Sequence, residues 1–183
     1  MTSVTAFAPA TVSNVACGFD VLGFALDEPG DEVTATLAPA GVRIDAIEGD
    51  GGRLPREASR NTAGVAVLAL LNKLADPRGV ALTIRKGLPL SSGLGGSAAS
   101  AVAAVMAVNE LLGANASRET LIASALEGER LGAGSSHADN VAPSICGGAP
   151  RSCPRAIGTE ARSPTCVARV RTPPGSPTVS RRH

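Results

Sequence analysis

The segment Pro89-Leu90-Ser91-Ser92-Gly93-Leu94-Gly95-Gly96-Ser97-Ala98-Ala99-Ser100 leads directly into a run of alanines and valines that ends at Leu112. This apolar run predicts a helix over residues 97–112, closed by Gly113. Glycines let the preceding chain turn tightly around a bound group, and the first N–H groups of a helix have no partner within it. Because a helix N-terminus carries partial positive charge, the expected occupant of the turn is an anion such as phosphate.

Three phosphate-binding patterns can be compared with this segment. A Walker A loop needs a lysine after its last glycine, and Ser97 stands near that position instead. The dinucleotide-binding pattern is formally present, because Gly93 begins a G-x-G-x-x-A match and Glu110 follows at roughly the usual distance. That pattern needs its first glycine at the tip of a strand, whereas Pro89 and several other residues separate the glycine from the nearest apolar run.

The third pattern is the long loop Pro-x-x-x-Gly-Leu-Gly-Ser-Ser-Ala, which the segment resembles closely, with Gly96 in place of the first serine. This loop is typical of the small-molecule kinase superfamily that includes galactokinase, homoserine kinase, mevalonate kinase and phosphomevalonate kinase. The resemblance implies that the loop holds the phosphates of ATP; a glycine-rich turn without a ligand is the alternative. The implied cofactor-binding residues of the loop are Pro89, Leu90, Ser91, Ser92, Gly93, Leu94, Gly95, Gly96, Ser97, Ala98 and Ala99.

Composition argues against several classes of protein. The chain has 183 residues, of which 44% are hydrophobic, and this suits one globular domain or slightly more. A formal net charge of +1 and an aromatic content of 2% give no reason to expect a nucleic-acid partner. The four cysteines form no C-x-x-C pair, so neither a zinc site nor a disulfide framework is predicted. Residues 98–112 are too short an apolar stretch to span a membrane, and we expect a cytoplasmic protein without a membrane partner.

Apolar runs and turn residues predict the remaining elements. Strands are expected at residues 2–8, 33–37, 42–47 and 80–84, and helices at 63–75, 97–112 and 118–131. Pro9 is expected to stop the first strand, and residues 48–60 to form an exposed loop. This order predicts an α/β (α+β) two-layer sandwich rather than a doubly wound sheet. The resemblance implies the same architecture, the GHMP kinase N-terminal domain, which is related to ribosomal protein S5 domain 2.

The segment after Pro9 consists of small residues and contains Asn14 and Asp20. Both residue types suit a closely approaching ligand, but both are also ordinary turn residues. Ser13-Asn14 followed by Gly18-Phe19-Asp20 resembles the N-terminal substrate motif of homoserine kinases. By that resemblance, Asn14 and Asp20 bind L-homoserine.

Asn61 precedes the helix at residues 63–75 and can serve as its N-cap. In the resembling kinases the matching asparagine lies near adenine, and both roles can hold together. Glu127 and Glu129 are two residues apart on a predicted helix, so only one can face the phosphate loop, and a solvated helix face is the alternative for either. The resemblance implies that Glu129 and the Ser97 hydroxyl hold Mg²⁺, a cation that takes oxygen ligands.

His137, Asp139 and Asn140 lie in a glycine-rich segment that is predicted to be a loop. From the residues alone, His137 is either a general base oriented by a carboxylate or a hydrogen-bonded loop residue. The pattern His-x-Asp-Asn followed by Gly147-Gly148 resembles the homoserine kinase signature, in which the histidine and the asparagine contact the substrate. The implied reaction transfers phosphate from ATP to the L-homoserine hydroxyl without a dedicated base. Its catalytic candidates are Asn140, Ser97 and Glu129.

The chain changes character at about residue 149. Residues 1–148 carry 10 Lys+Arg against 15 Asp+Glu, whereas residues 149–183 carry seven arginines, six prolines and a single acidic residue, Glu160. We therefore predict an ATP-binding domain over residues 1–148 and an Arg/Pro-rich tail over 149–183 that is disordered or comes from a shifted reading frame.

The leading hypothesis is a homoserine kinase of threonine biosynthesis that uses ATP and Mg²⁺. The sequence leaves open whether the chain forms a homodimer. One alternative is another kinase of the superfamily, acting on mevalonate or a sugar. The other is a non-catalytic fragment that binds nucleotide without turnover. The resemblance favours this last alternative in one respect, because the family's substrate-clamping arginines come from the half that is not recognisable beyond Gly148.

Overall fold

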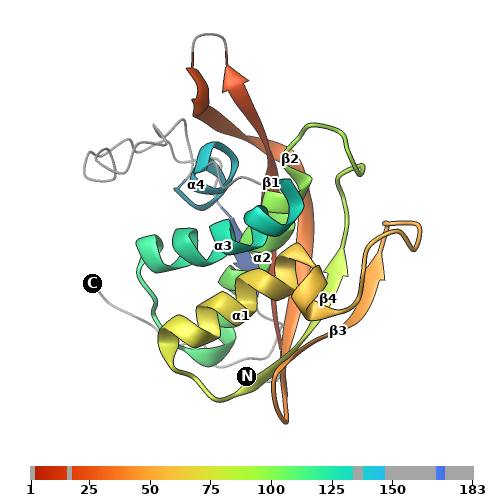
Figure 1. Ribbon diagram of the computed structural model, residues 1–183, viewed down its shortest axis with the longest axis vertical. Coiled ribbons are helices and arrows are strands. Elements are labelled where there is room, and N and C mark those ends of the chain that lie inside the picture. Colours follow the sequence, from red (N-terminus) through yellow and green to blue (C-terminus); the bar gives the residue numbers. More distant parts are fainter. Residues whose placement is uncertain (1–2, 16–17, 134–137, 147–167, 172–183) are drawn as a thin grey trace.

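The computed structural model describes residues 3–15, 18–133, 138–146 and 168–171, and these form one five-stranded sheet with α-helices packed against one face (Figure 1). The strand order is β3-β4-β2-β1-β5. The strands are β1 (Ser3–Val15), β2 (Gly18–Ala38), β3 (Val42–Glu48), β4 (Gly79–Arg85) and β5 (Arg169–Arg171). The helices are the 3₁₀ turn η1 (Ala58–Arg60), α1 (Thr62–Leu74), α2 (Gly96–Leu112), α3 (Arg118–Ala133) and α4 (Ala138–Cys146). This arrangement confirms the predicted two-layer sandwich.

Alternation along the strands separates a buried face of the sheet from a wet one. In the first part of β1, buried hydrophobic residues recur at every second position, at Val4, Ala6, Ala8 and Ala10. The opposite face is polar: the hydroxyls of Thr5 and Thr34 are 2.8 Å apart, and Arg85 forms ion pairs with Glu32 and Glu48. One face of the sheet therefore packs on the helices, and the other meets water.

Helix α2 lies at the centre of the packing. It touches β1, β2 and the three other α-helices, and most of its residues are buried. Its buried positions are mainly alanines and valines, whose small side chains let neighbouring backbones come close. Within the described ranges, neither α2 nor any other helix has the length and apolar character needed to cross a bilayer.

The first two strands are longer than the sequence predicts. Alternation predicts a stop at Pro9, whereas β1 continues to Val15. Pro9 pairs with Gly30 at an irregularity in the β1–β2 register, which is where a strand tolerates a residue without an N–H group. The pairing then continues to Val15 opposite Gly18, so the small-residue segment belongs to a hairpin rather than to a loop.

Residues 138–146 form α4, although the sequence predicts a loop there. Pro143 lies inside this helix and has no N–H group to offer the carbonyl of Asp139, four residues earlier. That carbonyl lies against Gly23 of β2, because a Cβ added at Gly23 would come within 1.8 Å of the Asp139 oxygen. The carbonyl that the proline leaves without a helical bond is thus packed against the sheet, where only glycine leaves room for it.

One short piece of the tail belongs to the sheet. Strand β5 pairs antiparallel with β1, with Val170 opposite Ala6, and Ala168 N donates to Ser144 O at 2.9 Å. No strand is predicted there from the sequence. The rest of the tail lies outside the described residues, so the domain boundary at residue 148 stays a prediction.

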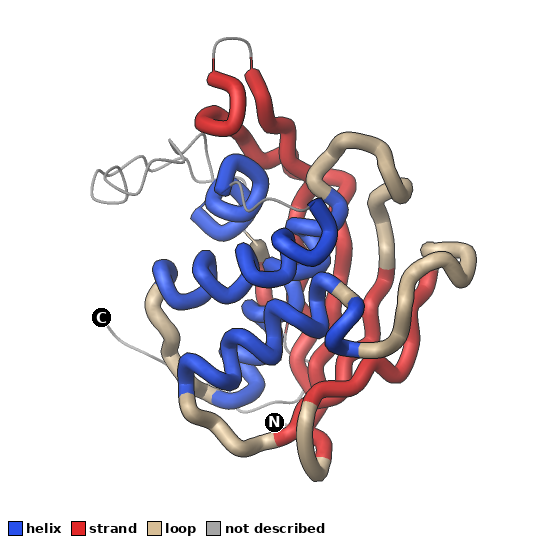
Figure 2. The backbone as a smooth tube through the Cα atoms, in the orientation of Figure 1, coloured by secondary structure: helices blue, strands red, loops and turns tan. Residues whose placement is uncertain are grey.

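Two long loops begin at the same end of the sheet. Strands β3 and β4 are parallel, so the loops that follow them, residues 49–61 and 86–95, start side by side (Figure 2). The two loop bases touch, since Lys86 N donates to Glu48 O at 2.8 Å and a Cβ added at Gly49 would lie 2.5 Å from Lys86 O. The topology therefore brings Asn61 and the predicted phosphate loop to one end of the molecule.

A first prediction concerns the crossing of α1 and α3. A Cβ at Gly128 would lie 2.4 Å from the Thr62 carbonyl oxygen, which is backbone and cannot swing away. Helix propensity alone would make Gly128→Ala stabilising by about 0.8–1 kcal/mol. Overpacking costs roughly 1–3 kcal/mol, so we expect the substitution to lower the free energy of unfolding in a urea titration. A more stable variant would contradict the close packing.

Candidate active site

The predicted phosphate loop connects β4 to α2. Ser91, Gly93 and Gly95 have positive φ angles of 62°, 74° and 64°, so the loop turns repeatedly before the helix begins. Residues 91–93 are exposed, whereas Leu88 before them is buried. Predicted residues 96–99 form the first turn of α2, whose N–H groups point back toward the loop. This geometry suits an anion-binding loop whose tip, residues 91–93, is exposed and whose two ends are fixed.

Thr11 of β1 bonds to two other parts of the candidate site, the phosphate loop and Asn140 of α4. Its backbone N–H donates to Leu94 O at 3.1 Å, and its hydroxyl donates to Asn140 Oδ1 at 2.7 Å. Asn140 Nδ2 in turn donates to Ser13 Oγ at 3.2 Å. These bonds hold the Asn140 amide with its oxygen toward Thr11 and its nitrogen toward Ser13. Segments more than 120 residues apart in the sequence thus form one polar cluster.

The other predicted substrate residues are placed less completely. Asn14 is exposed near the end of β1, with φ of 59° and its Nδ2 3.5 Å from Ser13 Oγ. It therefore adjoins the cluster that holds Asn140. Asp20 lies in β2, and His137 lies outside the described residues. Their predicted roles stay predictions.

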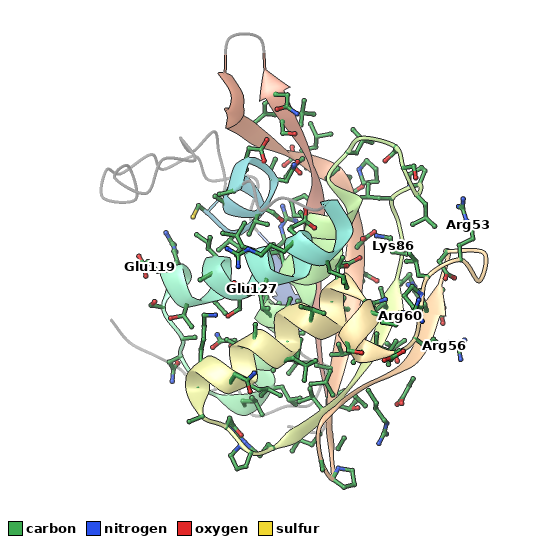
Figure 3. The ribbon with its side chains drawn as sticks, in the orientation of Figure 1. Arg53, Arg56, Arg60, Lys86, Glu119 and Glu127 are labelled. Carbon is green, nitrogen blue, oxygen red and sulfur yellow. The ribbon has the colours of Figure 1, made fainter. Side chains whose placement is uncertain are left out.

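Glu127 and Glu129 face different environments, as their spacing predicts. Glu127 is partly exposed and pairs with Arg130 at 3.3 Å (Figure 3). Glu129 is only 6% exposed, and among the described residues its Oε1 atom has no hydrogen-bond partner. A buried carboxylate oxygen without a partner is costly, so it indicates a position that a ligand completes.

Burial raises the pKa of the Glu129 carboxyl above its usual range. A hydrogen bond from the Ser97 hydroxyl acts in the opposite direction and lowers it. The charge of buried Asp139 raises the same pKa and that of Lys86 lowers it. Glu129 therefore lies where a positive charge would be strongly favoured.

The residues at this position fit a Mg²⁺ ion. Among the described residues no cluster of three or more His, Cys, Asp or Glu side chains could hold a metal. Mg²⁺ does not need such a cluster, since it usually takes one or two protein oxygens and completes its shell with water and phosphate oxygens. The unpartnered oxygen of Glu129 and the neighbouring Ser97 hydroxyl supply that sparse set.

Asn61 serves as the N-cap of α1, as predicted. Its Oδ1 accepts from Ala63 N at 3.0 Å, and its Nδ2 donates to Pro55 O at 2.9 Å. Both ends of the buried amide are thus engaged in fixing the loop before the helix. The implied position near adenine is not tested by these contacts and stays a prediction.

The structure also brings polar residues into the site that sequence reasoning overlooks. They are Thr11, Asp31, Lys86 and Ser100. A signal existed for two of them. Asp31 shares the buried phase of β2 with Val33, and Lys86 continues the buried phase of β4 beyond Ile84. A charge at an apolar phase indicates a buried ion pair or a site.

Part of the chain matches a known protein family. Residues 61–148 match the family model described as the GHMP kinases N terminal domain. Over these residues the chain is therefore similar to the GHMP kinases N terminal domain. The chain is similar to homoserine kinase from Chloroherpeton thalassium, with 46% identity over 185 residues covering 95% of this chain and 56% of the relative. This alignment runs past residue 148 and so includes part of the tail.

Solved structures agree with this assignment. The crystal structure of homoserine kinase from Cytophaga hutchinsonii has 53% identity and a TM-score of 0.75, over 78% of this chain and 46% of that one. The L. major mevalonate kinase in complex with R-mevalonate shares the fold, with 22% identity and a TM-score of 0.62 over 79% of this chain and 47% of that one. The chain spans about half the length of the relatives it matches.

A second prediction separates two adjacent glycines of the phosphate loop. A Cβ at Gly95 would lie 2.1 Å from Thr11 Oγ1 on a residue with φ of 64°, whereas a Cβ at Gly96 would meet nothing closer than 3.6 Å. We expect Gly95→Ala to lower the free energy of unfolding by at least about 1–2 kcal/mol. Gly96→Ala is expected to raise it by roughly 0.4–1 kcal/mol. Parallel urea titrations compare them, and equal effects would contradict the close approach at Gly95.

A third prediction concerns pH. Because the folded pKa of Glu129 is raised, the native state holds this proton more tightly than the unfolded chain. Wild-type stability therefore falls as pH rises from the ordinary glutamate value of 4.5 through the folded pKa. Glu129→Gln removes this loss, so its stability relative to wild type should improve as the pH rises above the ordinary glutamate value of 4.5.

Urea titrations at several pH values measure this difference. The matched control is Glu127→Gln, a partly exposed carboxylate on the same helix that pairs with Arg130. A stability difference between Glu129→Gln and wild type that stays constant with pH would contradict the buried, proton-retaining carboxylate.

Proposed function

We propose that this chain is the ATP-binding part of a homoserine kinase, which transfers the γ-phosphate of ATP to the side-chain hydroxyl of L-homoserine. The hydroxyl oxygen forms the new bond to phosphorus while the bond to the leaving ADP oxygen breaks. The proposal includes a cytoplasmic location and a role in threonine biosynthesis. The proposal includes no nucleic-acid or membrane partner.

The observation that carries the proposal is the junction of three motifs at Thr11. There the Leu94 carbonyl of the phosphate loop accepts from the backbone N–H of Thr11, and the Asn140 amide oxygen accepts from the Thr11 hydroxyl. A phosphate-binding loop and a substrate-facing amide at one place are what transfer between two bound molecules requires. Identity of 53% to a homoserine kinase structure, against 22% to a mevalonate kinase, supports L-homoserine as the acceptor.

Each group has a role in this proposal. The N–H groups at the start of α2 and the loop backbone bind phosphate oxygens, and the oriented Asn140 amide holds the acceptor hydroxyl. Asn14 and Asp20 contact the amino-acid end of the substrate. Glu129 and the Ser97 hydroxyl would hold Mg²⁺, which supplies charge neutralisation at the phosphates. Positioning and electrostatics, rather than a strong base, supply the rate.

A second candidate is a fragment that binds nucleotide without turnover. It is favoured by one observation, namely that the chain spans 46% of the length of the homoserine kinase structure it resembles. Groups that complete the substrate site in a full-length kinase would then come from the other half. Both candidates predict nucleotide binding, and only the first predicts acceptor-dependent turnover.

The fourth prediction tests both candidates in one experiment. Calorimetric titration of the purified chain with Mg²⁺-ATP measures binding, and ADP release is then followed with L-homoserine, mevalonate or galactose. We expect binding, and release with L-homoserine alone. Binding without release would support the fragment, and release with mevalonate or galactose would support a different kinase. Absence of binding in a folded sample would contradict both.

Variants connect the result to the site. Glu129→Gln and Ser97→Ala are expected to weaken Mg²⁺-ATP binding about 10-fold or more, because a hydrogen bond or contact to a charged group is worth about 1.5–3 kcal/mol. Glu127→Gln, two residues away and paired with Arg130, should bind as wild type does. Unchanged affinity in the first two variants would remove the metal assignment.

A further inference from the structure

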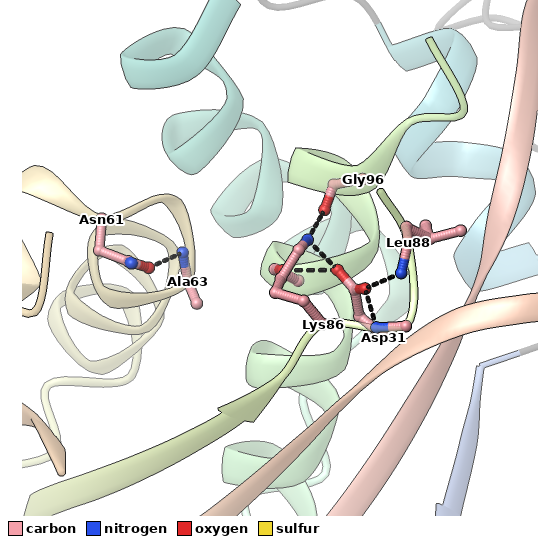
Figure 4. Close-up of polar contacts among 8 residues, drawn as sticks. Asp31, Asn61, Ala63, Lys86, Leu88 and Gly96 are labelled. Carbon is pink, nitrogen blue, oxygen red and sulfur yellow. Dashed lines mark hydrogen bonds and ion pairs between the residues drawn. The ribbon is translucent and has the colours of Figure 1, made fainter. Parts of the chain in front are cut away.

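A buried ion pair lies beneath the phosphate loop (Figure 4). The Asp31 side chain on β2 is fully buried, and the Lys86 side chain at the end of β4 is 3% exposed. The Lys86 ammonium contacts Asp31 Oδ2. Asp31 Oδ1 accepts from the backbone N–H groups of Gly87 at 3.0 Å and Leu88 at 3.2 Å. The carboxylate thus binds the first two residues after Lys86, where the loop begins.

The same pair also binds the start of α2. Lys86 Nζ donates to Gly96 O at 2.7 Å and to Ser100 Oγ at 2.9 Å. The Ser100 hydroxyl in turn donates a hydrogen bond to Asp31 Oδ2 at 2.7 Å. All three ammonium donors and both carboxylate oxygens are therefore used. The far end of the loop is tied to the same two charges as its beginning.

The position of the Lys86 ammonium depends on the charge of Asp31. A cation at a helix N-terminus is disfavoured, because that end of the helix carries partial positive charge. Lys86 nevertheless lies against the first turn of α2, and Asp31 is the buried counter-charge that offsets this cost. Removing the charge of Asp31 would leave the ammonium buried against the positive end of the helix.

Stability alone does not explain the pair. Val33 and Ile84, on the same faces of the same two strands, are apolar and fully packed. Well-packed apolar residues in place of a buried ion pair are often neutral or stabilising. What an apolar pair could not do is bond the N–H groups of Gly87 and Leu88 at one end of the loop and the Gly96 carbonyl at the other.

We propose that Asp31 is a positioning residue for the phosphate loop. Asp31 sets the distance between the two ends of the loop, both through its own oxygens and through Lys86 and Ser100. The exposed tip of the loop, residues 91–93, then has the shape required to bind a triphosphate. This inference rests on the proposed function for its ligand, but the positioning itself can be measured without any ligand.

The test compares Asp31→Asn with Glu32→Gln in the full chain. Glu32 is the next residue on β2 and pairs with Arg85 on the wet face of the sheet, so it controls for loss of a neighbouring carboxylate. Amide hydrogen exchange of residues 87–95 reports the order of the loop, and calorimetric titration with Mg²⁺-ATP reports its function. A urea titration reports stability separately.

This fifth prediction has a definite outcome. In Asp31→Asn we expect faster exchange at residues 87–95 and a dissociation constant for Mg²⁺-ATP raised about tenfold, which corresponds to about 1.4 kcal/mol. Glu32→Gln should match wild type in both. A folded Asp31→Asn protein with wild-type exchange and affinity would overturn the proposal, and so would a loss of stability without either change, since that would indicate a purely structural pair.

Two further measurements keep the test decisive. If Asp31→Asn does not fold, Ser100→Ala retains the ion pair but removes one bridge from Asp31 to α2, and faster exchange at residues 87–95 is again the expected result. Wild-type exchange in that variant would overturn the proposal. If the wild-type chain binds no Mg²⁺-ATP, the proposed function fails, whereas the exchange measurement still decides whether Asp31 orders the loop.

Discussion

The close packing of α2 is the constraint on which the rest of the structure depends. This helix is covered on nearly every side, by β1 and β2 and by the three other α-helices, so its first turn cannot shift without disturbing the whole core. Small side chains such as Ala98, Ala103 and Ala107 make that approach possible. The consequence for chemistry is direct: the helix N-terminus that faces the phosphate loop is held by the core and not by the loop itself.

Much of this architecture follows from local sequence signals. Apolar and β-branched patterns predict the first half of β1, the end of β2 and most of β3 and β4, and apolar runs with their caps predict α1, α2 and α3 to within a few residues. Two of the misses involve a proline: Pro9 is predicted to stop the first strand, and Pro143 lies inside a helix where the glycine-rich sequence predicts a loop. Each lies instead where the missing N–H is harmless, one at a register irregularity and the other opposite Gly23. Only the tertiary partner distinguishes such a proline from a true terminator.

The candidate site could be predicted from the sequence only in part. The resemblance to the kinase motifs implies roles for Ser97, Glu129 and Asn140, but it does not reveal that Thr11 joins Asn140 to the phosphate loop. Buried carboxylates show the limit most clearly. Asp31 has both oxygens satisfied by Lys86, Ser100 and two backbone N–H groups, whereas Glu129 keeps one oxygen without a partner among the described residues. Whether a buried charge stabilises the fold or awaits a ligand depends on this accounting, which sequence alone does not provide.

Strand β5 changes the role of β1 in the sheet. At Thr5, Ala6 and Phe7, β1 is hydrogen-bonded on both sides, to β2 and to β5. Without residues 169–171 this stretch would present a row of unpaired backbone groups beside buried alanines, which is the usual template for pairing with another chain. The short tail strand therefore works as protection against self-association at one margin of the sheet. Two of its three residues are arginines, and charged side chains on an outermost strand discourage the addition of a further one.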